Sequence, residues 1–134
     1  MKILAVIPAR AGSKGIPNKN IRLINNKPLI YYAIKNALSS SFISKVIVTT
    51  DSPEIEVIAL QMGVKVKQRN VDLCGDAVTL DSVIYDAIDG EYDYVVTMQP
   101  TSPTLQYSTL DRAIEYTINN NLDSVISVVN KPHL

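Results

Sequence analysis

The sequence predicts a three-layer α/β/α fold, in which helices cover both faces of a mostly parallel β-sheet. Short runs of β-branched and apolar residues alternate along the chain with segments whose apolar residues recur at helical spacing. Strands joined through helices in this way form right-handed crossovers. The 134 residues are 46% hydrophobic, enough for one core, and no repeat or linker interrupts them. We therefore expect one domain over residues 1–134.

The expected strands are short and mainly apolar. The first, residues 3–7, ends at Pro8 and is too short and too branched for a helix. The others are expected at residues 45–50, 64–67, 94–98 and 124–129. In residues 64–67 valine alternates with lysine, which is typical of a strand near the edge of a sheet.

The expected helices lie between these strands, at residues 28–38, 53–62, 80–88 and 108–118. The stretch from Asp51 to Glu54 offers capping side chains and places Pro53 at the first position of the second helix, and Gly63 is suited to end it. Ser108, with Asp111 three residues later, predicts the start of the last helix.

The charges are divided unevenly along a chain whose formal net charge is zero. Residues 1–50 contain no acidic residue and eight basic ones, namely Lys2, Arg10, Lys14, Lys19, Arg22, Lys27, Lys35 and Lys45. The remaining residues carry all thirteen acids and only five basic residues. This asymmetry indicates an anionic ligand on the first part of the chain.

Several classes of protein are disfavoured by what the sequence lacks. Cys74 is the only cysteine, so the chain has no internal disulfide, which fits a reducing compartment. The apolar run after Lys2 is five residues long, too short for a signal peptide or a membrane span. We expect a cytoplasmic protein that binds neither membranes nor nucleic acids.

The loop after the first expected strand, residues 8–20 with the sequence PARAGSKGIPNKN, is the candidate site. Ligands of open α/β sheets bind beyond the carboxyl ends of the strands, and glycines allow backbone N–H groups to approach phosphate oxygens closely. The loop matches neither G-x-x-x-x-G-K-[ST] nor G-x-G-x-x-G. A surface turn with solvated lysines is therefore the alternative to a phosphate site.

Residues 7–20, IPARAGSKGIPNKN, resemble the amino-terminal signature of the acylneuraminate cytidylyltransferases (CMP-sialic acid synthetases), a family that includes enzymes for legionaminic and pseudaminic acid. Further similarities are Asp51, Arg69 with Asp76, and the segment QPTSP at residues 99–103. The resemblance implies a Rossmann-like fold of the nucleotide-diphospho-sugar transferase type. It also implies transfer of a cytidylyl group from CTP to a nonulosonic acid, with release of pyrophosphate.

The resemblance assigns nucleotide contacts to Arg10, Gly12, Ser13, Lys14, Lys19, Asn20 and Arg69. Arg10 and Lys19 are the expected catalytic residues, because a guanidinium can bind two phosphate oxygens and a lysine supplies a mobile point charge. Positive charge there would stabilise the negative charge that develops on the phosphate. For Arg69, an ion pair with Asp72 or Asp76 is the alternative.

The resemblance assigns sugar contacts to Gln99 and Ser102. The amide of Gln99 follows an apolar strand, where burial without partners would be costly and a ligand would supply partners. Where family members often carry serines that contact the nucleotide, this chain offers Thr79 or Ser82 instead. Thr79 is equally expected to be only the N-cap of the third helix.

The family places its Mg²⁺-binding aspartates and much of its dimer contact in a later carboxyl-terminal part. The resemblance therefore implies Mg²⁺ as the cofactor and a homodimer for the full-length protein, with no metal ligand assigned within these residues. The alternatives are a catalytically incomplete nucleotide-binding fragment and a nucleotidyltransferase for another ulosonic acid. A dinucleotide-binding oxidoreductase is disfavoured, because no acidic residue follows the glycines at a distance of about 20 residues.

Overall fold

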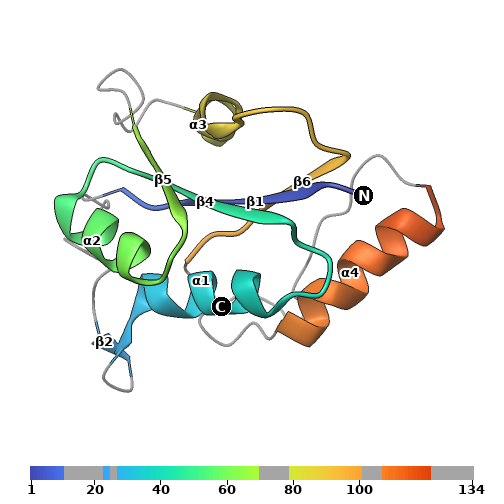
Figure 1. The fold of residues 1–134 in the computed structure, drawn as a ribbon, viewed down its shortest axis with the longest axis horizontal. Helices are drawn as coiled ribbons and strands as arrows, with labels where there is room; N and C mark the ends of the chain where they lie inside the picture. Colours follow the sequence, from blue (N-terminus) through green and yellow to red (C-terminus); the bar gives the residue numbers. More distant parts are fainter. Residues whose placement is uncertain (11–22, 25–26, 70–78, 101–106, 122–134) are drawn as a thin grey trace, which may run out of the picture.

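The computed structural model describes residues 1–10, 23–24, 27–69, 79–100 and 107–121. Their elements, in chain order, are β1 (Ile3–Pro8), β2 (Leu23–Ile24), β3 (Lys27–Pro28), α1 (Leu29–Ser39), β4 (Lys45–Thr50), α2 (Pro53–Gln61), β5 (Lys65–Gln68), α3 (Leu80–Ala87), β6 (Tyr94–Thr97) and α4 (Tyr107–Asn119). Figure 1 shows these elements arranged around one central sheet.

The central sheet has the strand order β5-β4-β1-β6, and every neighbouring pair is parallel. Ala5 in β1 lies opposite Val46 in β4 on one side and Val96 in β6 on the other. The chain builds the sheet from β1 towards β5 and then returns to add β6 on the other side of β1, so the strand order reverses at β1. Because all four strands are parallel, their carboxyl ends lie at one edge, which we call the carboxyl rim.

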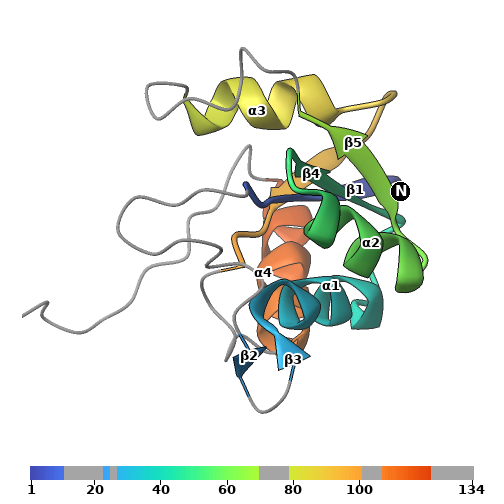
Figure 2. The same ribbon diagram turned by 90° about the vertical axis from the view of Figure 1, so that its left-hand side faces the viewer.

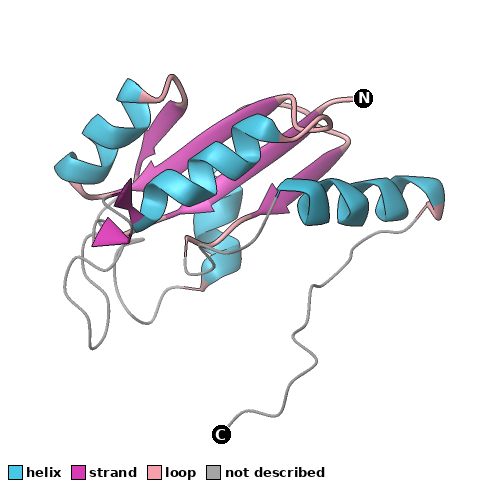
Figure 3. Ribbon diagram, turned by 90° about the horizontal axis from the view of Figure 1, so that it is seen from below, coloured by secondary structure: helices cyan, strands magenta, loops and turns pink. Residues whose placement is uncertain are grey.

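The sheet lies between two layers of helices, as Figure 2 shows: α3 covers one face, and α1, α2 and α4 cover the other. Side chains alternate along β1, so Ile3, Ala5 and Ile7 pack into the core beneath the three helices. Leu4 and Val6 point to the opposite face and pack beneath α3. The view in Figure 3 shows α1, α2 and α4 side by side on their face of the sheet. The predicted three-layer α/β/α fold is confirmed.

The ends of α2 follow the predicted chemistry. The Ser52 hydroxyl accepts a hydrogen bond from the Ile55 N–H at 3.3 Å, and Pro53 occupies the first turn. Gly63 follows the helix with a φ of +80°, a backbone conformation that glycine adopts without strain. Ser52 is also buried directly beyond β4, so this cap fixes the path of the chain as it leaves the carboxyl rim.

Removing this cap will destabilise the domain. We expect Ser52→Ala to lower the free energy of unfolding by about 1 kcal/mol, because the Ile55 N–H loses its acceptor. Urea unfolding followed by circular dichroism measures the change. Ser39→Ala, at the exposed end of α1, is the matched control and is expected to change stability by less than about 0.5 kcal/mol. Equal losses in the two variants would contradict the assignment of the cap.

The start of α4 differs from the prediction. The helix begins at Tyr107, so Ser108 lies within its first turn rather than at the N-cap. The Asp111 carboxylate instead accepts hydrogen bonds from the Ser40 hydroxyl and from the Ser41 N–H, the latter at 3.0 Å. A tertiary contact to the end of α1 therefore uses the side chain that we expected to support a local cap.

Three other observations on the fold bear on the predictions. The antiparallel pair β2–β3 was not predicted, because strands of two residues are too short to show a hydrophobic period. The strand expected at residues 124–129 lies outside the described residues. Within the described part of the chain, no helix combines the length and the apolar character needed to cross a membrane.

Candidate functional site

Four of the residues singled out from the sequence follow the carboxyl ends of the four parallel strands. Along the sheet their order is Arg69 after β5, Asp51 after β4, Arg10 after β1 and Gln99 after β6. Because the four strands are parallel, the backbone of these four segments lies at the same rim. The reversal of strand order at β1 places Arg10 and Gln99 on neighbouring strands, where open α/β sheets bind their ligands.

Backbone hydrogen bonds continue past the strand ends and fix this rim. The Ala9 N–H donates to the Thr49 carbonyl at 3.0 Å, and the Met98 N–H donates to the Val6 carbonyl at 3.0 Å. Each bond lies one residue before a candidate side chain, Arg10 in the first case and Gln99 in the second. These side chains therefore start from backbone that is held against the neighbouring strand.

Arg69 is anchored to the end of β4 by both its backbone and its side chain. Its N–H donates to the Thr50 carbonyl at 2.9 Å, and its Nη2 donates to the Thr49 carbonyl at 3.3 Å. The Thr49 carbonyl thus accepts from the Arg69 guanidinium and from the N–H of Ala9, which precedes Arg10. This single oxygen links the two arginine-bearing segments. The sequence did not indicate it, because a main-chain acceptor has no residue signature.

The alternative partners weighed for Arg69, Asp72 and Asp76, lie outside the described residues, so that alternative stays untested. The same is true of six predicted site residues, namely Gly12, Ser13, Lys14, Lys19, Asn20 and Ser102. Of the residues predicted to contact the nucleotide or the sugar, the structure therefore places Arg10, Arg69 and Gln99.

The environment of Gln99 corrects one argument made from the sequence. Gln99 is exposed, whereas its neighbours Met98 and Pro100 are buried. Water can therefore solvate the amide, and no burial cost requires a ligand to offset it. The argument from burial therefore does not apply to Gln99, and the strand before it, β6, alternates half-buried and exposed residues. The sugar contact now depends on the resemblance alone.

Thr79 is the N-cap of α3, as one of its two interpretations predicted. Its hydroxyl accepts from the Ser82 N–H at 3.3 Å, and the two hydroxyl oxygens are 2.8 Å apart. Because α3 follows β5, this helix start lies on the same side of the sheet as the carboxyl rim. A nucleotide contact from either hydroxyl stays a prediction.

The described residues do not fit a metal centre. Among them, no group of three His, Cys, Asp or Glu side chains is placed to hold a metal ion. Asp51 is at the rim, but a Mg²⁺ site normally requires further oxygen ligands.

The fold is that of an open parallel α/β sheet, a class of protein in which ligands bind beyond the carboxyl ends of the strands. Comparison with known protein families identifies the family of this chain. The chain belongs to the cytidylyltransferase family, whose sequence profile matches residues 4–133. The resemblance seen in residues 7–20 is thereby confirmed at the level of the family.

Relatives that are named for different sugar acids are similar to this chain in sequence. The chain is 43% identical to CMP-N,N'-diacetyllegionaminic acid synthase of Legionella pneumophila, over 86% of this chain and 53% of the relative. It is 38% identical to N-acylneuraminate cytidylyltransferase of Escherichia coli, over 98% of this chain and 32% of the relative. The chain thus spans about half the length of the first relative and about a third of the second.

A solved structure has the same fold. CMP:2-keto-3-deoxy-manno-octonic acid synthetase complexed with CTP superposes with a TM-score of 0.75 at 26% identity, covering 90% of this chain and 49% of that one. The Rossmann-like fold implied by the resemblance is therefore confirmed.

Proposed function

We propose that this chain is the nucleotide-binding part of a cytidylyltransferase that activates a nonulosonic acid with CTP. The observation that carries the proposal is the link between the two arginine segments through the Thr49 carbonyl at the carboxyl rim. Family membership and the names of the relatives support the type of reaction. The solved structure of similar fold, a complex with CTP, supports the choice of nucleotide.

In the proposed reaction, the anomeric hydroxyl oxygen of the sugar acid forms a bond to the α-phosphorus of CTP. The bond between this phosphorus and the oxygen bridging to the β-phosphate breaks, and pyrophosphate leaves with the electron pair. The hydroxyl proton passes to water, and the product is a CMP-sugar. This type of transfer requires accurate positioning and positive charge near the phosphate oxygens, rather than covalent catalysis by the protein.

Each candidate residue has a role in this proposal. Arg10 binds phosphate oxygens with its planar fork, and Lys19 adds a mobile charge to the developing pyrophosphate. The other nucleotide contacts come from Gly12, Ser13, Lys14, Asn20 and Arg69, and the sugar contacts from Gln99 and Ser102. Mg²⁺ dependence, a homodimer of the full-length protein and a cytoplasmic location stay predictions.

Two measurements on the chain test the proposal. The first is calorimetric titration with CTP. The second is pyrophosphate release in the presence of CTP, Mg²⁺ and one of four acids: N-acetylneuraminic, legionaminic, pseudaminic and 2-keto-3-deoxy-manno-octonic acid. Release above background with a nonulosonic acid, lost in Arg10→Ala, is the expected result.

The other outcomes separate the alternatives. Pyrophosphate release only with the eight-carbon acid, the substrate named for the structural neighbour, would identify that ulosonic acid as the substrate instead. CTP binding without release from any acid would identify a nucleotide-binding module that does not catalyse the transfer. Absence of CTP binding would overturn the proposal.

A further inference from the structure

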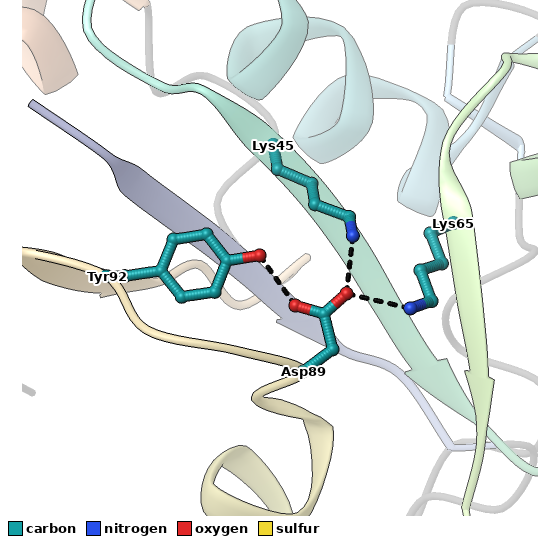
Figure 4. Close-up of polar contacts among 4 residues, drawn as sticks. All are labelled: Lys45, Lys65, Asp89 and Tyr92. Carbon is teal, nitrogen blue, oxygen red and sulfur yellow. Dashed lines mark hydrogen bonds and ion pairs between the residues drawn. The ribbon is translucent and has the colours of Figure 1, made fainter.

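A polar cluster lies at the amino-terminal ends of the strands, on the opposite side of the sheet from the carboxyl rim. Its centre is Asp89, which follows α3 in the turn leading to β6. One carboxylate oxygen pairs with Lys45 and, at 2.7 Å, with the ammonium group of Lys65, and the other accepts from the Tyr92 hydroxyl at 2.6 Å. Figure 4 shows the three side chains converging on this carboxylate from different elements.

The partners of Asp89 come from the beginnings of three strands. Lys45 is the first residue of β4, Lys65 is the first residue of β5, and Tyr92 lies two residues before β6. The two lysines are about half exposed, so each ion pair alone would contribute little. Sharing one carboxylate joins them into a network that depends on a single side chain.

The beginning of β1 joins the same cluster through Lys2. The Lys2 ammonium lies 5.0 Å from the centroid of the Tyr92 ring, a cation–π distance. The Lys2 N–H donates to the Asp93 carboxylate at 2.7 Å, and the Asp93 N–H donates to the Lys2 carbonyl at 2.8 Å. The starts of all four strands of the sheet are therefore connected, and we call these residues (Lys2, Lys45, Lys65, Asp89, Tyr92 and Asp93) the amino-terminal clasp.

The charges of the clasp are complementary at neutral pH. Hydrogen bonds from Lys45, Lys65 and Tyr92 stabilise the ionised carboxylate and hold the pKa of Asp89 well below its usual value of 3.8. The Tyr92 hydroxyl donates to this carboxylate, which raises the pKa of the phenol. The carboxylate therefore stays ionised, and both lysines keep their partner, across the physiological range.

Strand β6 is, with β5, one of the two edge strands of the described sheet that this clasp connects to the other strands. It has only four residues, and among the described residues β1 is its only partner in the sheet. Residues 88–93 lead into it from α3, which has crossed from β5 over to the far side of β1. The clasp holds this turn against the neighbouring strands at the point where β6 begins, and Gln99 follows shortly after β6 ends.

We propose that Asp89 is a positioning residue: it holds the start of β6 in register with β1 and so sets where Gln99 stands beside the Arg10 segment at the opposite rim. The role of Asp89 in holding β6 concerns the sheet alone. The consequence for a bound sugar acid, through the position of Gln99, rests on the proposed function.

Hydrogen exchange of the folded chain tests whether Asp89 holds β6 in register with β1. In Asp89→Asn, which keeps the shape but removes the charge, we expect the β6 amides and the Met98 amide to exchange about tenfold faster, because the charge-assisted hydrogen bonds from both lysines are weakened. The Val48 amide in the centre of β4 is expected to be unchanged, and the Gln99 amide resonance is expected to shift. Glu91→Gln removes an exposed charge from the same turn and is the matched control.

A uniform increase in exchange that includes Val48 would overturn the proposal, because it would show a general loss of stability. An unchanged β6, or an equal effect of Glu91→Gln, would overturn it as well. If Asp89→Asn does not fold, the same exchange measurement is made on Tyr92→Phe, which removes only one hydrogen bond of the clasp. In Tyr92→Phe we expect the same pattern, at about threefold, and an unchanged β6 would again be contradictory.

Enzyme kinetics test whether Asp89 sets the position of Gln99 for the sugar acid. In the Asp89→Asn variant we expect the KM for the sugar acid to rise several-fold more than the KM for CTP, because Gln99 is assigned to the sugar. Equal changes in the two KM values would overturn the positioning of Gln99. If the unmodified chain does not bind CTP, the proposed function fails, while the exchange result still decides the role of Asp89 in the sheet.

Discussion

Replacing Arg10 with alanine will weaken the binding of CTP by about tenfold to a hundredfold. A hydrogen bond to a charged group contributes about 1.5 to 3 kcal/mol, and this change corresponds to the net loss of one such bond between the guanidinium and the phosphate oxygens. Arg10 is half-buried, and the residue before it is bonded to the Thr49 carbonyl at 3.0 Å. Its side chain therefore projects from a fixed point of the rim, so less conformational freedom is lost on binding. Isothermal titration calorimetry measures the change.

Two further variants sharpen this experiment. Arg112→Ala removes the same charge from the exposed surface of α4, and we expect it to change CTP affinity by less than about twofold. Arg10→Lys keeps the charge and loses the planar fork, so its affinity is expected to lie between those of the original chain and Arg10→Ala. If Arg10→Ala binds CTP as tightly as Arg112→Ala does, Arg10 does not contact the phosphates.

Replacing Leu4 with alanine will lower the free energy of unfolding by about 2 to 5 kcal/mol. Leu4 is 0% exposed at the centre of the sheet and packs with Ile47 and Ala87 beneath α3. On this face α3 is the only helix among the described residues. Few neighbouring side chains are therefore available to move into the cavity that the substitution leaves. Urea unfolding, followed by circular dichroism, measures the loss.

The matched control for Leu4 is the same substitution on the surface. Leu60 in α2 is 56% exposed, and Leu60→Ala is expected to change stability by less than about 0.5 kcal/mol. Similar losses in the two variants would show that the small cluster beneath α3 is not a tightly packed core.

The fold followed from the sequence because its signals are local and repeated. Residues 3–7 and 45–50 are too short and branched for helices, and helical spacing separates them, so parallel crossovers were the consistent arrangement. The ends of α2 were predicted for a related reason: Ser52 and Gly63 act on backbone within a few residues of themselves. The start of α4 was misplaced because Asp111 binds the end of α1, about 70 residues away in the chain.

The candidate site was predictable in its location and less so in its contacts. Parallel strands bring their carboxyl ends to one edge, so the order of elements alone placed Arg10, Arg69 and Gln99 on one rim. The exposure of Gln99 depends on how β6 is covered, which no short stretch of sequence encodes.

Residue types and their spacing were enough to specify the layers of this protein, the direction of its strands and the family signature in residues 7–20, since each depends on neighbours along the chain. Packing in three dimensions decided that the Thr49 carbonyl joins two arginine segments and that Asp89 gathers Lys45 and Lys65. Those contacts join segments between 20 and 44 residues apart in the chain. Their formation depends on the register of the strands, which exists only once the sheet has assembled.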